Sequence, residues 1–167
     1  KYFFITTSDH NTSEQYYFNV DEKEPHPKLI KKRKRGILYS VNSWDGKFYN
    51  HTNENAEDFK IDVTENLEKE NWKIFIPAKE EVLIGGLTFL NNWILRSETS
   101  DALDKLFVKN ITTGIEEEML FSDESVYVPG VSLIQRDKNT DEIYLSYSSP
   151  KTQSRVYSYN LSSKEKK

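Results

Sequence analysis

The chain has 167 residues, a formal net charge of −4 and no cysteine, and 30% of its residues are charged. The lack of cysteine excludes disulfide bonds and thiolate metal sites. The acidic balance argues against a nucleic-acid footprint, and no apolar run approaches the roughly 20 residues that a transmembrane helix needs. We therefore expect a soluble protein that has neither nucleic acid nor a membrane among its partners.

Short runs rich in aromatic and β-branched residues recur along the chain, and such residues suit the pleated surface of a sheet. In chain order, the predicted strands are residues 2–6, 16–18, 28–30, 36–41, 47–50, 59–61, 72–76, 82–90, 92–96, 106–108, 117–121, 126–134, 142–147 and 156–158. Neighbouring runs lie close enough along the chain to form hairpins. The sequence therefore predicts an all-β fold with antiparallel pairing.

Four of these runs end in a similar phrase, in which Asn or Asp precedes a branched aliphatic residue and then a hydroxyl or acidic residue. The copies are Asn19-Val20-Asp21, Asp62-Val63-Thr64, Asn110-Ile111-Thr112 and Asn160-Leu161-Ser162. An Asn or Asp side chain can accept a hydrogen bond from the backbone two residues on, which starts a turn. A period of roughly 40 to 50 residues is typical of a repeat architecture. We therefore expect one turn that is built four times.

Four short strands per repeat predict a partial β-propeller of about three to four four-stranded antiparallel blades. We expect an incomplete blade at 1–35, complete blades at 78–122 and 36–77, and a second incomplete blade at 123–167. We interpret the chain as part of a longer protein, because the first blade lacks an innermost strand and the last lacks an outer one. An eight-stranded barrel is the alternative, but a barrel has no longer period.

We recognise no catalytic, cofactor-binding or metal-ligating residue in the sequence. His10, His26 and His51 are far apart, without a second ligand at metal-binding spacing, and are expected in exposed turns. Gly130-Val131-Ser132 begins like a nucleophile elbow, but bulky residues follow where a small one is needed, so we dismiss Ser132 as a nucleophile. The pair Gly85-Gly86 indicates a bulge or close packing in a strand, not a phosphate loop.

Other features also have a structural interpretation. The run from Lys31 to Arg35 contains five cations, which must be solvated or paired, and we expect an exposed inter-blade loop in preference to a polyanion patch. Four Asn-x-Ser/Thr sequons are interpreted as chance; they begin at Asn11, Asn50, Asn110 and Asn160. The tryptophans are expected to pack between blades, with ligand stacking as the alternative; they are Trp44, Trp72 and Trp93.

A set of short segments resembles the propeller of the oligopeptidase B (protease II) family, in the prolyl oligopeptidase group of serine peptidases. The segments include Trp44-Asp45-Gly46-Lys47-Phe48-Tyr49, Thr52-Asn53, Asp58-Phe59, Glu70-Asn71-Trp72, Ile76-Pro77 and Tyr147-Ser148-Ser149. The chain departs from the family pattern at turns and strand edges. These departures are Ser125-Val126-Tyr127 for Pro-Ala-Tyr, Ala102-Leu103 for Gly-Leu and Thr152-Gln153 for Thr-Pro.

The resemblance implies that the chain is the non-catalytic, substrate-gating part of an oligopeptidase that cleaves short peptides after Lys or Arg. The family's Ser, Asp and His triad lies in an α/β-hydrolase domain of the same parent chain, and its Gly-Gly-Ser-x-Gly-Gly motif does not occur here, so no catalytic residue is carried over. The innermost strands, 37–41, 82–90 and 126–134, are expected to line the channel. The resemblance implies no cofactor, and the default location is the cytoplasm.

Two further expectations concern partners. The alternative function is a stand-alone propeller scaffold that binds a protein partner. Because uncovered blade faces and strand edges are templates for pairing, we also expect the chain to associate with itself. The expected edge aromatics are Tyr2, Phe4, Tyr157 and Tyr159.

Overall fold

The computed structural model describes residues 1–69, 71–120, 126–133 and 138–167. These residues form two compact units, Lys1–Glu80 and Glu81–Lys167, each of which contains two antiparallel sheets. The first unit holds β1 (Tyr2–Ser8), β2 (Ser13–Asn19), β3 (Lys28–Lys31), β4 (Tyr39–Trp44), β5 (Lys47–Thr52), β6 (Lys60–Thr64) and β7 (Lys73–Ile76). The second unit holds β8 (Leu83–Leu90), β9 (Trp93–Ser100), β10 (Leu103–Asn110), β11 (Glu116–Glu118), β12 (Val128–Leu133), β13 (Glu142–Ser148) and β14 (Arg155–Asn160).

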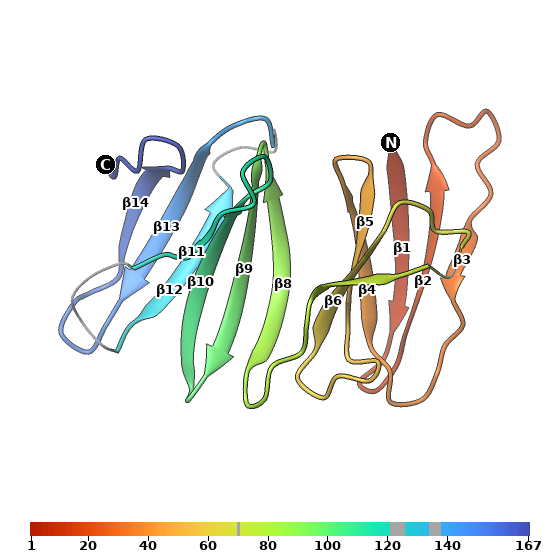
Figure 1. Ribbon diagram of the computed structural model, residues 1–167, viewed down its shortest axis with the longest axis horizontal. Helices are drawn as coiled ribbons and strands as arrows, with labels where there is room; N and C mark the ends of the chain where they lie inside the picture. The colour runs from red at the N-terminus through yellow and green to blue at the C-terminus, as the bar shows by residue number, and fades with distance from the viewer. Residues whose placement is uncertain (70, 121–125, 134–137) are drawn as a thin grey trace. The chain divides into compact units, whose positions relative to one another are not determined.

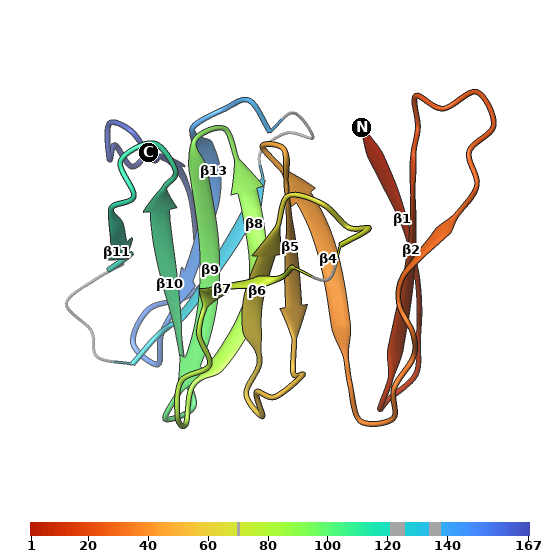
Figure 2. The ribbon, with the colours of Figure 1, turned by 45° about the vertical axis from the view of Figure 1, so that its right-hand side comes forward.

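Each sheet follows chain order, so every strand pairs with its sequence neighbour. The first sheet is β1-β2-β3 and the second is β4-β5-β6-β7, while the third is β8-β9-β10-β11 and the fourth is β12-β13-β14 (Figure 1). Figure 2 shows the strands of the third sheet side by side, with β11 at one edge and β8 at the other. Every predicted run overlaps a strand, although residues 121 and 134 lie outside the described residues. The predicted fold class, a partial β-propeller of antiparallel sheets with three or four strands, is confirmed.

Three copies of the turn phrase form the predicted turn. The backbone N–H groups of Asp21, Thr112 and Ser162 each donate to the side-chain oxygen of the Asn two residues earlier, at 3.1, 2.9 and 3.0 Å. The backbone bonds of Asn110 and Asn160 also correspond. The N–H of Gly114 donates to the carbonyl of Asn110, and the N–H of Lys164 donates to the carbonyl of Asn160, both at 2.8 Å. Gly114 and Lys164 both have positive φ, 73° and 59°.

The prediction for the remaining copy, Asp62-Val63-Thr64, is wrong, because Asp62 lies inside β6 and does not start a turn. Its carboxylate is buried and forms an ion pair with Lys60 at 3.0 Å, so it is not available to cap the backbone. The turn comes two residues later, where the N–H of Asn66 donates to the hydroxyl of Thr64 at 3.2 Å. Asp62 therefore acts as a buried strand residue, and Thr64 takes the capping role.

The two sheets of the first unit are joined by apolar packing around Tyr39, Val41 and Phe48 and by side chains that bond to backbone. Ser13 Oγ on β2 accepts from the N–H of Tyr39 at 2.6 Å and donates to its carbonyl at 2.8 Å. The amide of Gln15 does the same for Val41, accepting at 2.7 Å and donating at 3.3 Å. Since buried backbone groups need partners, these two side chains complete the hydrogen bonding of β4, an edge strand of its sheet.

Tyr39 returns this contact through its hydroxyl. The β2–β3 ladder shifts register between Gln15 and Tyr16. The Tyr39 hydroxyl lies at this irregularity, where it accepts from the N–H of Gln15 at 2.9 Å and of Lys31 at 3.2 Å and donates to the Lys31 carbonyl at 2.7 Å. Burial raises the pKa of Tyr39, so the neutral, donating phenol persists at neutral pH. One phenol thus fixes the end of β3.

The second unit is joined by aliphatic packing. Its core contains Leu90, Leu95, Val108, Ile143, Leu145 and Leu161. At the rim of this core, Asp141 accepts hydrogen bonds from Asn91, Trp93 and Ser162. The β8–β9 register shifts between Ile84 and Leu87, so the predicted bulge at Gly85-Gly86 is confirmed, and a side chain at Gly85 would overlap Ser97 on the neighbouring strand.

Two of the four predicted edge aromatics pack against a core. Phe4 packs against the core of the first unit, Tyr159 packs against that of the second, and the Tyr2 ring lies 4.9 Å from Phe48. Tyr157 lies under the Lys166 ammonium, 4.5 Å from the ring centroid. Tyr2 nevertheless remains 40% exposed, and further exposed apolar side chains on the strands include Phe3, Ile5, Tyr144 and Val156.

Candidate functional site

The histidines form no site. His10 and His26 are exposed in loops, as predicted, but His51 lies in β5, where it stacks on Phe59 with ring centroids 4.6 Å apart. The expectation of an exposed turn is therefore wrong for His51, because the run around it continues as a strand. Within the described ranges, no group of three or more His, Asp or Glu side chains could hold a metal ion, and no helix is long and apolar enough to cross a membrane.

The remaining motif residues have structural positions. The backbone at Ser132 pairs with Tyr144 in the β12–β13 ladder, so the strand-to-helix turn of a nucleophile elbow does not form there. Asn50 is fully buried, which rules out glycosylation of the folded chain at that sequon. Trp93 donates its indole N–H to Asp141 at 3.2 Å, whereas Trp72 packs beside the core of the first unit.

The basic segment, which we define as residues 31–35, is the main concentration of charge that remains. Lys31 is the last residue of β3, and the next four residues are exposed and lead to β4. The segment therefore connects two sheets, and the predicted exposed inter-blade loop is confirmed. Lys31 forms an ion pair with Glu54 at 2.9 Å, and Lys34 lies 3.9 Å from the same carboxylate.

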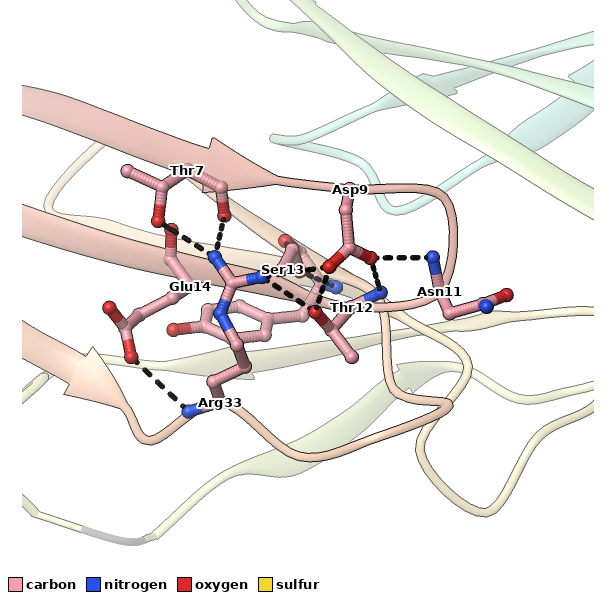
Figure 3. Close-up of polar contacts among 8 residues, drawn as sticks. Thr7, Asp9, Asn11, Thr12, Ser13, Glu14 and Arg33 are labelled. Carbon is pink, nitrogen blue, oxygen red and sulfur yellow. Dashed lines mark hydrogen bonds and ion pairs between the residues drawn. The ribbon is translucent and has the colours of Figure 1, made fainter.

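Arg33 attaches this segment to the turn between β1 and β2 (Figure 3). Its Nη2 donates to the carbonyl and hydroxyl of Thr7, both at 3.1 Å, and its Nη1 donates to Thr12 Oγ1 at 2.6 Å and to Asp9 at 3.3 Å. The backbone N–H groups of Asn11 and Thr12, both 2.8 Å from Asp9, hold the pKa of that carboxyl below its usual range. The Arg33 side chain therefore holds the basic segment against the β1–β2 hairpin.

A groove of about 710 Å³ is lined in part by the basic segment. Its walls are Leu29, Ile30, Lys31, Lys32, Lys34, Ile37, Tyr39, Thr52, Glu54 and Trp72. The Lys31 ammonium lies 5.6 Å from the centre of the Trp72 ring, within range of a cation–π contact. The hydrogen bond and charge of Lys31 lower the pKa of Glu54, so the carboxylate in the groove is ionised at neutral pH.

A second charged cluster lies in the third sheet, and the sequence interpretation missed it. Arg96 on β9 is 3% exposed; it bonds Glu98 at 2.8 Å and reaches Glu116 on β11 through two bonds of 2.9 and 3.0 Å. Burial opposes the charge, but hydrogen bonds and charges of Glu116 and Glu98 raise the pKa of Arg96. The available signal was a pair of opposite charges two residues apart, Arg96 and Glu98, directly after the apolar run that ends at Leu95. Arg96, Glu98 and Glu116 are thus bonded to one another, and these bonds link β9 to β11.

The comparisons with known sequences and structures agree with this architecture. The chain is 26% identical over 178 residues to Protease 2 from Moraxella lacunata, covering 99% of this chain and 24% of that protein. It is 25% identical over 142 residues to Dipeptidyl aminopeptidase BI from Pseudoxanthomonas mexicana, covering 83% and 19%. The chain thus spans about a quarter or less of the length of these relatives.

Solved structures share the fold over nearly the whole chain. Oligopeptidase B from Trypanosoma brucei, in a closed form with covalently bound antipain, superposes with a TM-score of 0.88 at 21% identity, covering 100% of this chain and 25% of that one. Oligopeptidase B from Leishmania major gives 0.81 at 14% identity, covering 98% and 24%. The family described as prolyl oligopeptidase, N-terminal beta-propeller domain, matches residues 1–167. The chain therefore belongs to the family of N-terminal β-propeller domains of prolyl oligopeptidases.

Proposed function

We propose that this chain is the substrate-gating propeller of a serine oligopeptidase that cleaves short peptides after Lys or Arg. The observation that carries the proposal is the family match across the whole chain, together with relatives that are named as proteases and in which the propeller is joined to a catalytic domain. Each sheet would be one blade, with divisions at 1–35, 36–77, 78–122 and 123–167. The scaffold alternative is not favoured by these relatives.

The gating role rests on a physical argument. A propeller encloses a narrow channel between its innermost strands, and stacked blades form a rigid wall. In this chain those strands would be β4, β8 and β12. The nucleophile and general base would come from the catalytic domain of the parent, because the elbow considered at Ser132 is a paired strand.

The test uses the parent protein with this propeller in place. One cleavable Arg or Lys site is presented in peptides of increasing length and within a folded protein, and kcat/KM is measured for each. We expect hydrolysis of short peptides, a steep decline with length and no cleavage of the folded protein. Equal cleavage of the folded protein would contradict gating, and preference for an uncharged residue before the scissile bond would contradict the Lys/Arg specificity.

Two untested expectations belong to the same proposal. We keep the cytoplasm as the location, to be tested by cell fractionation. We also propose that the isolated chain associates with itself through exposed apolar residues such as Phe3 (53% exposed) and Val156 (65% exposed). Light scattering coupled to size exclusion should reveal a dimer or larger species; a strict monomer at high concentration would contradict this.

A further inference from the structure

The groove beside the basic segment has features of a binding site that the gating role does not use. Three consecutive residues of β3, namely Leu29, Ile30 and Lys31, all line it. Because consecutive side chains on a strand point to opposite faces, only a groove that follows the strand edge can contact all three. β3 is an edge strand of the first sheet, so its outer backbone groups can pair with an added strand.

The charge of the groove favours an anionic occupant. Lys31, Lys32 and Lys34 face a single carboxylate, that of Glu54. Lys31 and Lys34 share this carboxylate, and Lys32 has no ion-pair partner among the described residues. Two positive charges therefore remain uncompensated in the groove of a chain whose net charge is −4.

The site is preorganised by contacts on its far side. Arg33 is held by Thr7, Asp9 and Thr12, and its neighbours on either side, Lys32 and Lys34, line the groove. The Tyr39 hydroxyl fixes the backbone of Lys31. A ligand would therefore meet backbone that is already ordered, which lowers the entropy lost on binding.

The residues that line the groove also favour an acidic peptide over other anions. A groove of about 710 Å³ is within the roughly 300 to 1,000 Å³ typical of ligand sites, and Ile30, Ile37 and Trp72 give it apolar walls. A nucleic-acid backbone would bring phosphates against Glu54 without filling these walls. An extended peptide can place carboxylates near the lysines, an apolar side chain against Trp72 and its backbone along β3.

We propose that this groove binds an acidic, extended peptide segment that carries an apolar residue between its carboxylates. The segment differs in charge from the Lys- and Arg-ended peptides proposed as substrates of the parent enzyme. The proposal and the gating role can fail independently. The occupant would be a regulatory or partner segment.

Fluorescence polarisation with the full 167-residue chain tests the proposal. The probe is a fluorescein-labelled peptide of sequence Glu-Glu-Leu-Glu-Glu, and the control peptide replaces each Glu by Gln. We expect saturable binding of the acidic peptide that weakens with added salt, and at least about tenfold weaker binding of the control. No binding of the acidic peptide would overturn the proposal.

Three variants locate the binding. Lys32→Glu with Lys34→Glu should weaken binding at least about tenfold, whereas Lys23→Glu with Lys151→Glu makes the same change in net charge at exposed positions outside the groove and should have little effect. Glu54→Gln should strengthen binding, since it releases Lys31 and Lys34. This gain would not follow from damage to the fold.

Each other outcome contradicts the proposal. Equal losses in the two double variants would indicate attraction by net charge alone. Tighter binding of a single-stranded oligonucleotide than of the acidic peptide would indicate a polyanion patch. Circular dichroism checks the fold; if the Glu variant is unfolded, Lys32→Gln with Lys34→Gln replaces it.

Discussion

The two units solve the same packing problem, the joining of two sheets, with different chemistry. In the first unit, Ser13 and Gln15 bond directly to the backbone of the neighbouring sheet, and Tyr39 bonds back. In the second unit, a cluster that includes Ile143 and Leu145 fills the interface with aliphatic side chains. The first unit thus adds directional bonds to the apolar packing around Tyr39, Val41 and Phe48, whereas the core of the second unit is aliphatic, so the two should respond to different kinds of substitution.

The polar contacts of the first unit have a physical cause in the backbone N–H and C=O groups of an edge strand. β4 is an edge strand whose backbone would be buried without partners, and polar side chains from β2 supply those partners. The core of the second unit consists of aliphatic residues, whose burial stabilises without any required geometry.

The largest expected effect is in the aliphatic joint. Ile143→Ala removes the side chain of a residue with 0% exposure and should destabilise the second unit by about 2–5 kcal/mol, from lost burial and the cavity that remains. Urea unfolding gives the size, and hydrogen exchange shows which unit opens. Ile143→Val is the matched control, at about 0.5–1.5 kcal/mol. Equal opening of both units would contradict the proposed division of the chemistry.

The polar joint should be most sensitive at one hydroxyl. Tyr39→Phe keeps the ring but leaves the N–H groups of Gln15 and Lys31 and the Lys31 carbonyl without their partner, at a cost of about 1–3 kcal/mol. Tyr16→Phe is the matched control, because its hydroxyl bonds only the partly exposed Glu14 side chain. If the two variants lose equal stability, the Tyr39 hydroxyl does not join the sheets.

A smaller effect is expected in the pH dependence of stability, through Asp141 in the second unit. The hydrogen bond from Ser162, followed by those from Asn91 and Trp93, lowers the pKa of Asp141 in the fold. Its contribution is therefore present above the unfolded value of about 4 and is lost as the pH falls through the lower folded value. The stability difference between the wild type and Asp141→Asn should shrink below about pH 4. A difference that does not depend on pH would contradict this role for Asp141.

The smallest effects should come from two exposed turns, because the one contact that such a turn makes with another sheet, the ion pair of Lys164 with Glu117, is exposed. Gly114 and Lys164 occupy equivalent positions with positive φ. Gly114→Ala should lose about 1 kcal/mol, whereas Lys164→Gly should change stability by less, because relief of the left-handed backbone offsets the added flexibility of the unfolded chain. Thermal unfolding measures both. A gain in stability for Gly114→Ala would show that the two turns are not equivalent.

The sequence predicted the strands well because their signal is local. Alternating apolar side chains and Asn-started turns depend on residues that are adjacent in the chain, and three of four turn phrases behaved as expected. The exception, Asp62, failed because its partner Lys60 and its burial compete with the turn. The basic segment was recognised as an exposed loop, but its division into an anchored Arg33 and a groove-lining Lys32 and Lys34 was not.

The sequence by itself thus determined the order of the strands along the chain and three of the four repeated turns. Only the tertiary structure decided which polar residues join the sheets, since Ser13 and Gln15 meet Tyr39 and Val41 across 26 residues of chain. It also decided that Arg96 is buried with Glu98 and Glu116, and that Lys31, Glu54 and Trp72 line one groove. Such contacts depend on register and on how sheets pack face to face, and neither is encoded in a local pattern of residues.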